Sequence, residues 1–145
     1  MTPKNILAVC VGNICRSPMA EALLAQALPD ARVSSAGIGA LVGHEADKHA
    51  QVLMRERGLD VSAHKARQLT SQISRISDVI LVMEQDHQEF IERQFPLTRG
   101  KVFRLGQFDK LDIPDPYRQD RAAFEYALRL IDQGVQAWAQ RIAKF

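Results

Sequence analysis

The hydrophobic residues of this chain follow two alternating patterns. Short continuous apolar runs, such as residues 78–83 (DVILVM), are typical of strands that are buried on both faces of a parallel sheet. Between these runs lie longer stretches in which apolar residues recur at helical spacing, as Met19, Leu23 and Ala27 do. The pattern therefore predicts strands that alternate with helices.

The predicted elements cover most of the chain. Strands are expected at residues 5–10, 32–36, 78–83 and 101–105, and helices at 18–28, 46–57, 71–76, 84–94 and 121–144. Residues 106–120 contain two prolines and are expected to form a loop. Ser17 is a suitable N-cap for the first helix, with Pro18 at its first position, and Gly58 suits the position just after the second helix.

The order of these elements favours one fold class. Alternating strands and helices predict an α/β protein with a single domain over residues 1–145, built on a four-stranded parallel sheet with helices on both faces. This is a doubly wound, flavodoxin-like layout, in which ligands bind beyond the carboxyl ends of the strands. The turn after the first strand and the loop after the fourth are therefore the expected functional segments.

Composition and charge narrow the possible functions. The chain has 145 residues, of which 46% are hydrophobic and 25% charged, as in an ordinary globular protein that can bury a core. Nineteen basic and 17 acidic residues give a net charge of only +2, which argues against a nucleic-acid binder driven by bulk charge. No apolar run approaches the ~20 residues of a membrane span, so membrane insertion is not expected either.

The cysteines and histidines show no metal-ligand spacing. Cys10 and Cys15 have no second pair with which to complete a zinc site. Four histidines are scattered along the chain: His44, His49, His64 and His87. We therefore expect no metal and no cofactor. The two cysteines are either both inert, or one of them is reactive. The sequence shows no export signal, which favours a reducing, cytoplasmic location.

The turn after the first strand, residues 10–17 (CVGNICRS), has the features of an anion site. Its backbone N–H groups meet a helix N-terminus, and Gly12 and Asn13 are residue types that tolerate left-handed backbone. Arg16 can bind two phosphate oxygens through its planar fork. These surroundings favour the thiolate of Cys10, which is then set up to attack phosphorus. The predicted phosphate-binding loop comprises Val11, Gly12, Asn13, Ile14, Cys15 and Ser17.

Two other interpretations of this turn are less favoured. Cys10 by itself is more often a buried cysteine at a strand end, but the pattern C-x5-R-S-P between a strand and a helix favours a nucleophile. A Walker-type nucleotide loop is excluded because no G-K-[ST] follows the glycine.

Several motifs resemble one family along nearly the whole chain. The run VCVGNICRSPMAEA at residues 9–22 is similar to the phosphate loop of the low-molecular-weight protein tyrosine phosphatases. The similarity continues, in the same order, through residues 35–37 (SAG), 64–69 (HKARQL), 78–84 (DVILVME) and 115–117 (DPY). The stretches GALVGHEAD and RGKVFRLGQFDKLDIPDPYR resemble bacterial members that are associated with capsule or exopolysaccharide production.

The resemblance implies roles for individual residues. Cys10 would be the nucleophile and Arg16 the group that holds the phosphate, while Ser17 would stabilise the thiolate as a leaving group. Ser35 and His64 would join Asn13 and Ser17 in hydrogen bonds that support the loop. Tyr117 and Leu41 would form opposite walls of the pocket, and Leu41 stands where several family members carry an aromatic residue.

Asp115 is the expected general acid. A carboxylate between prolines is ordinarily a turn residue, but cleavage of a tyrosine phosphate needs a proton on the departing oxygen. The flanking prolines would hold Asp115 beside the Cys10 loop, and its carboxylate would then activate water in a second step. Asp112, three residues earlier, is expected to be a solvated loop charge.

The predicted function is hydrolysis of phosphotyrosine through a phosphocysteine intermediate. Family resemblance suggests a tyrosine autokinase that controls exopolysaccharide production as the phosphorylated partner, and a monomer is favoured. An arsenate reductase on the same fold would need further cysteines, and none follows Cys15. A phosphate-binding module without activity should have lost the nucleophile, the arginine or the acid, and all three are present.

Overall fold

A parallel sheet forms the centre of the computed structural model, which describes residues 4–144. Within these residues the sheet has four strands in the order β2-β1-β3-β4. Their bounds are Asn5–Cys10 (β1), Arg32–Gly37 (β2), Val79–Val82 (β3) and Val102–Arg104 (β4). The chain moves outward from β1 to β2 and then returns to the other side of β1 with β3. The carboxyl ends of β1 and β3 therefore flank the point at which ligands bind in such sheets.

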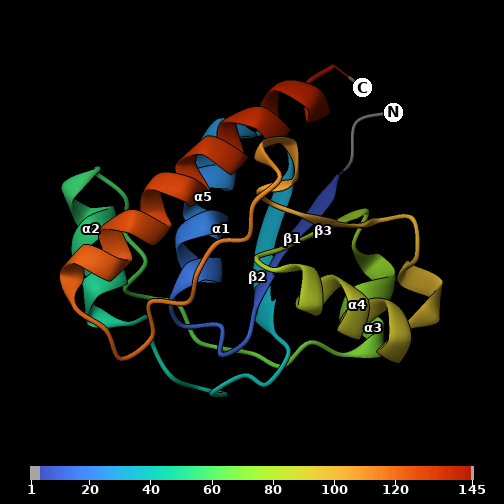
Figure 1. Cartoon of the computed structure of the whole chain (residues 1–145), viewed down its shortest axis with the longest axis horizontal. Coiled ribbons are helices and arrows are strands. Elements are labelled where there is room, and N and C mark those ends of the chain that lie inside the picture. The colour runs from blue at the N-terminus through green and yellow to red at the C-terminus, as the bar shows by residue number, and fades with distance from the viewer. Residues whose placement is uncertain (1–3, 145) are drawn as a thin grey trace.

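Helices cover both faces of the sheet (Figure 1). α1, α2 and α5 lie on one face, and α3 and α4 lie on the other. The helices span Arg16–Ala27 (α1), Lys48–Glu56 (α2), Ser71–Ile76 (α3), Gln85–Gln94 (α4) and Arg121–Ile142 (α5). The α/β fold with a doubly wound parallel sheet is thus confirmed.

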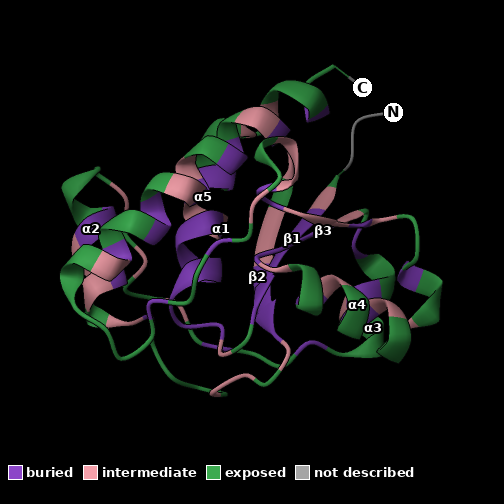
Figure 2. Cartoon of the chain, viewed as in Figure 1, coloured by how far each residue is buried: buried purple, intermediate pink, exposed green. Residues whose placement is uncertain are grey.

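Each face of the sheet has its own hydrophobic core. Ile80 and Val82 of β3 pack on the α4 side together with Ile91, whereas Leu81 and Met83 pack on the α1 and α5 side. Side chains of a strand point alternately to its two faces, so a strand covered on both sides is apolar throughout. Figure 2 shows buried residues along the sheet and on the helix faces turned towards it.

The first helix begins differently from the prediction. α1 starts at Arg16 with Cys15 as its N-cap residue, so Ser17 lies within the first turn and does not cap the helix. The physical reason is that the Ser17 hydroxyl is engaged by Asn13 and Cys10 instead. Gly58 follows α2 with a φ of +77°, and its expected position after the helix is confirmed.

Other boundaries differ by one or two residues. β3 and β4 are each shorter than predicted at both ends, and α5 ends at Ile142. The predicted loop 106–120 contains a short 3-10 helix, Gln107–Asp109, and a second 3-10 helix spans Pro96–Thr98. No helix within residues 4–144 is long and apolar enough to cross a membrane.

Candidate active site

The loop after β1 turns its carbonyl oxygens outward. The carbonyls of residues 10–14 all accept hydrogen bonds from neighbouring segments. Backbone N–H groups donate to four of them: Ile38 to Cys10, Gly39 to Val11, Leu41 to Gly12 and Asp47 to Ile14. The Asn13 carbonyl accepts from His64 Nε2. In a trans peptide the N–H points opposite to the C=O. The N–H groups of residues 11–15 therefore face the inside of the loop. A concave row of N–H groups is an anion-binding nest.

Asn13 supplies the sharp bend in this loop. Its backbone adopts a left-handed conformation, with a φ of +61°, and its side chain is fully buried. Gly12, which was expected to share this conformation, does not have a positive φ. A Cβ at Gly37 of β2 would lie 2.5 Å from the Val11 oxygen, so the loop lies directly on the glycine backbone.

A buried hydrogen-bond network connects Asn13 to the Cys10 sulfur. Asn13 Nδ2 donates to the hydroxyls of Ser17 and Ser35, at 2.7 and 3.0 Å, and Ser35 in turn donates to a Glu21 oxygen at 2.6 Å. Because the Ser17 oxygen already accepts from Asn13, its proton is free to point at Cys10 Sγ, 3.0 Å away. A hydroxyl that donates to the sulfur stabilises negative charge that develops there.

Two further contacts fix Asn13 from the other side. His64 lies 2.6 Å from the Asn13 carbonyl through Nε2, and because a carbonyl only accepts, Nε2 carries the proton. The Arg67 backbone N–H donates to Asn13 Oδ1 at 2.9 Å. The structure thus brings the predicted support residues Ser35 and His64 together around the loop, and adds Arg67, which sequence reasoning missed.

Arg16 is almost entirely buried, at 1% exposure, and is held on one edge only. Its Nη1 donates to Glu84 Oε2 at 2.6 Å and to the Ile113 carbonyl at 2.7 Å, which uses both protons of that nitrogen. Nε has no hydrogen-bond partner among the described residues, and Nη2 lies 3.7 Å from Asp115 Oδ2. The Nε and Nη2 edge is therefore available to bind two oxygens of a phosphate group.

Glu84, which holds Arg16, had no predicted role. It is the residue before α4 and the second residue after β3, at the point where the sheet reverses its strand order. An acidic residue at that point of the sheet was the sequence signal that could have marked Glu84 as a functional residue. Asp112 is an exposed loop charge, as expected, and it also accepts from the Gln85 backbone N–H at 3.1 Å and pairs with Arg104. It thus caps α4 in place of Glu84, whose carboxylate is directed to Arg16.

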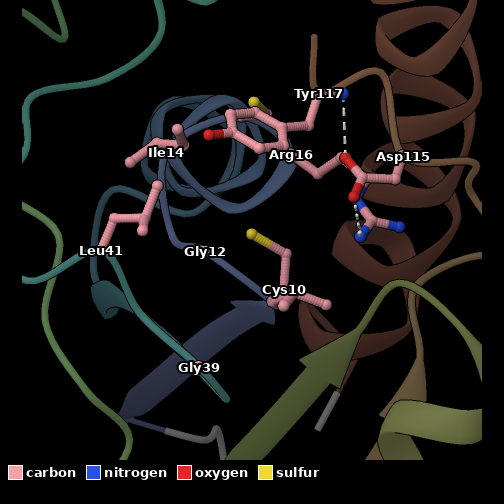
Figure 3. Close-up of a pocket in the computed structure, with 10 residues that line it drawn as sticks. Cys10, Gly12, Ile14, Arg16, Gly39, Leu41, Asp115 and Tyr117 are labelled. Carbon is pink, nitrogen blue, oxygen red and sulfur yellow. Dashed lines mark hydrogen bonds and ion pairs between the residues drawn. The ribbon is translucent and has the colours of Figure 1, made fainter.

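Asp115 lies at the mouth of the pocket on the loop between β4 and α5 (Figure 3). One carboxylate oxygen accepts from the Tyr117 backbone N–H at 3.0 Å, and the other faces Arg16. Gln119 donates to the Asp115 carbonyl, so the turn that carries the carboxylate is itself braced. The side chain is 44% exposed, which leaves it accessible to a substrate oxygen and to water.

The pocket above Cys10 has apolar walls. Ile14, Leu41 and the Tyr117 ring line it, while the Cys10 sulfur and the loop form the floor (Figure 3). Its free volume is about 160 Å³. A cavity of ~150 Å³ is large enough for benzene, so the space suits one aromatic ring. Within the described residues no group of histidine, cysteine or acidic side chains could hold a metal ion.

Cys15 differs chemically from Cys10, although both are free and buried. Burial, together with the Asp47 carboxylate, raises the pKa of the Cys15 thiol, so it remains protonated at neutral pH. We expect iodoacetamide at neutral pH to add one group to the folded protein, at Cys10, with inorganic phosphate slowing the reaction. Intact mass and peptide mapping measure this, and modification of Cys15 at a similar rate would contradict it.

Comparison with known proteins agrees with this geometry. Residues 5–145 match the family described as low molecular weight phosphotyrosine protein phosphatase. Over 139 residues the chain is 52% identical to a probable low molecular weight protein-tyrosine-phosphatase, EpsP, of Ralstonia nicotianae, covering 96% of each chain.

Solved structures of similar proteins share the fold. Wzb of Vibrio vulnificus, in complex with benzylphosphonate, has a TM-score of 0.92 at 46% identity over 95% of this chain and 98% of its own. An arginine phosphatase, YwlE of Geobacillus stearothermophilus, has a TM-score of 0.91 at 34% identity over 98% and 94%. On its sequence and its fold, the chain belongs to the low molecular weight protein-tyrosine phosphatases, as its motifs had indicated.

Proposed function

We propose that this phosphatase cleaves phosphotyrosine in two steps, with Cys10 as nucleophile. The sulfur lone pair attacks phosphorus and the bond from phosphorus to the tyrosine oxygen breaks, as Asp115 delivers its proton to that oxygen. The inward N–H groups of the loop and the free edge of Arg16 hold the phosphoryl oxygens throughout.

In the second step water attacks the phosphocysteine. The Asp115 carboxylate takes a proton from the water, the bond from phosphorus to sulfur breaks, and the electron pair returns to Cys10. Ser17 stabilises the departing thiolate through its hydroxyl, 3.0 Å from the sulfur. Phosphate leaves, and Asp115 is again protonated for the next cycle.

One observation carries this proposal. The nucleophile, the arginine and the acid come from β1, α1 and the loop before α5, and all three line the same pocket. The inward-facing amides of residues 11–15 form its floor. Transfer of a phosphoryl group to the sulfur and then to water uses every one of them.

The apolar walls support an aromatic substrate. Ile14, Leu41 and Tyr117 surround a space that fits one ring, and the Vibrio relative binds benzylphosphonate, which carries such a ring. A phosphoserine side chain is too short to bring its phosphorus to Cys10 from the pocket mouth. A phosphoarginine side chain would bring a polar guanidinium group against these walls, and the apolar walls disfavour it.

The partner we propose is a bacterial tyrosine autokinase that controls exopolysaccharide production. The similarity to EpsP and Wzb supports this choice. Free thiols stay reduced in the cytoplasm, so we place the reaction there. All the groups that the mechanism uses come from one chain, which supports action as a monomer.

Hydrolysis of matched peptides tests the proposed function. Peptides of one sequence carrying phosphotyrosine, phosphoserine or phosphoarginine are incubated with the pure protein and a thiol, with and without a chelator. We expect release of phosphate from phosphotyrosine at least about 100-fold faster, equivalent to ~2.7 kcal/mol in barrier, and no effect of the chelator. Faster cleavage of phosphoarginine, or loss of activity in chelator restored by a divalent ion, would overturn the assignment.

A further inference from the structure

His87 is a buried histidine that the mechanism above does not use. It lies in the first turn of α4 at 7% exposure, and its Nδ1 has no hydrogen-bond partner among the described residues. A buried polar side chain that is left half unpaired costs stability, so an apolar residue would be the simpler choice for packing alone. The other ring nitrogen accounts for its presence.

The other nitrogen of His87 faces the carboxylate that holds Arg16. Nε2 lies 3.4 Å from Glu84 Oε2, the same oxygen that accepts from Arg16 Nη1 at 2.6 Å. Arg16 and His87 thus share one oxygen of the Glu84 carboxylate.

The charges around His87 favour its neutral form. Burial and the positive charge of Arg16 lower the pKa of His87, while the carboxylates of Glu84, Asp86 and Asp112 oppose this shift. Asp112 is itself paired with Arg104. Protonation of Nδ1 would bury an N–H without an acceptor. At neutral pH the ring is therefore uncharged with its proton on Nε2, the nitrogen that lies 3.4 Å from Glu84 Oε2.

Although Asp112 already accepts from the Gln85 N–H, Glu84 occupies the N-cap position of α4, where its side chain has room to turn back and accept from other N–H groups of the first turn. Its side chain is 31% exposed and makes no capping hydrogen bond. A donor beneath the carboxylate opposes that turn and keeps the oxygen beside Arg16.

We propose that His87 is a positioning residue, which keeps the Glu84 carboxylate against Arg16 so that the free edge of the guanidinium meets the phosphoryl group. The proposal rests on the function proposed above. It assigns His87 no contact with substrate. Its effect reaches the reaction through Glu84 and Arg16 only.

Two substitutions of opposite character test it. His87→Phe keeps the ring volume and removes both nitrogens, whereas His87→Gln loses the ring and keeps a donor near the place of Nε2. We expect His87→Phe to weaken binding of inorganic phosphate, measured by calorimetry, and to lower kcat/KM for a phosphotyrosine peptide, each by about 10-fold. His87→Gln should stay within about 3-fold of the unmodified protein. A packing role predicts the reverse order, which would overturn the proposal.

A double-mutant cycle identifies the route of the effect. In a Glu84→Gln background, His87→Phe should change kcat/KM by less than about 2-fold, because the carboxylate that it positions is already gone. An unchanged 10-fold loss in that background would overturn the proposal. His49→Phe, the same change on α2 beside the Phe124 ring at 4.9 Å, serves as the matched control and should leave both measurements unchanged.

Two safeguards keep the test decisive. Thermal unfolding of every variant shows whether it folds, and if His87→Phe does not, the same comparison is made with His87→Leu. Phosphate affinity does not depend on turnover, so it tests the role of His87 even if the peptide assay contradicts the proposed function. Wild-type phosphate affinity in the folded variant would then overturn the role of His87 alone.

Discussion

Replacing Cys10 by serine is expected to abolish hydrolysis of phosphotyrosine while phosphate binding is retained. The hydroxyl of serine is a far weaker nucleophile than a thiolate, but the inward N–H groups of the loop and Arg16 hold the anion without the sulfur. Turnover should fall to below about 1% of the original, equivalent to at least ~2.7 kcal/mol in barrier. Steady-state kinetics measure the loss, and calorimetry with inorganic phosphate measures the retained binding.

Cys15→Ser provides the matched control for this experiment. Cys15 is equally buried, at 3% exposure, and belongs to the same loop. Its sulfur takes no part in the proposed steps, so its replacement should retain most of the activity. Residual turnover above about 1% in Cys10→Ser would show that Cys10 is not the nucleophile. Loss of phosphate binding in that variant would instead mean that the loop had changed shape.

Replacing Asp115 by asparagine is expected to slow substrates in proportion to how poorly their leaving group departs. A tyrosine oxygen, with a pKa of about 10 in its free form, needs a proton, and loss of the donor should cost about 10²–10⁴-fold in kcat. An activated phenol departs without that proton and should be slowed much less. The test is to measure kcat of both proteins on a series of aryl phosphates whose leaving groups differ in pKa. The slope of log kcat against that pKa should be steeper for Asp115→Asn than for the original protein.

The control for the Asp115→Asn experiment lies in the same loop, between β4 and α5. Asp109→Asn, in the short helix Gln107–Asp109, makes the same chemical change away from the pocket and should leave the series unaltered. An equal loss for all leaving groups in Asp115→Asn would mean that Asp115 only shapes the turn through the Tyr117 N–H. The proposed proton transfer would then be wrong.

Features that depend on local sequence were predictable. The continuous apolar run 78–83 is a strand between two cores, because both faces of β3 are covered. Gly58 follows α2 because its left-handed backbone suits glycine. The position of residues 10–17 between a strand and a helix defined the phosphate loop.

Features that depend on distant partners were not predictable in the same way. Ser17 has the residue type of an N-cap, but its hydroxyl is engaged by Asn13 and Cys10, and the helix begins two residues earlier than predicted, at Arg16. Gly12 has the residue type of a bend, yet Asn13 makes it, held by its buried side-chain contacts. Local propensity is a weak guide where tertiary hydrogen bonds compete with it.

The partners of Arg16 lie farthest from it in sequence. Glu84 is 68 positions away and Ile113 is 97, and they meet Arg16 only because β3 adjoins β1 and the loop before α5 passes the same edge. A single sequence marks neither pairing. The sheet order is what makes these contacts possible.

Leu41 shows that selection of a substrate and the chemistry performed on it can change independently. Its backbone N–H donates to the Gly12 carbonyl at 3.1 Å and so helps to shape the loop, whereas its side chain forms part of the pocket wall (Figure 3). Any residue except proline can supply that N–H. Mutational drift at this position can therefore exchange one preferred phosphoprotein for another while the reaction machinery is inherited intact.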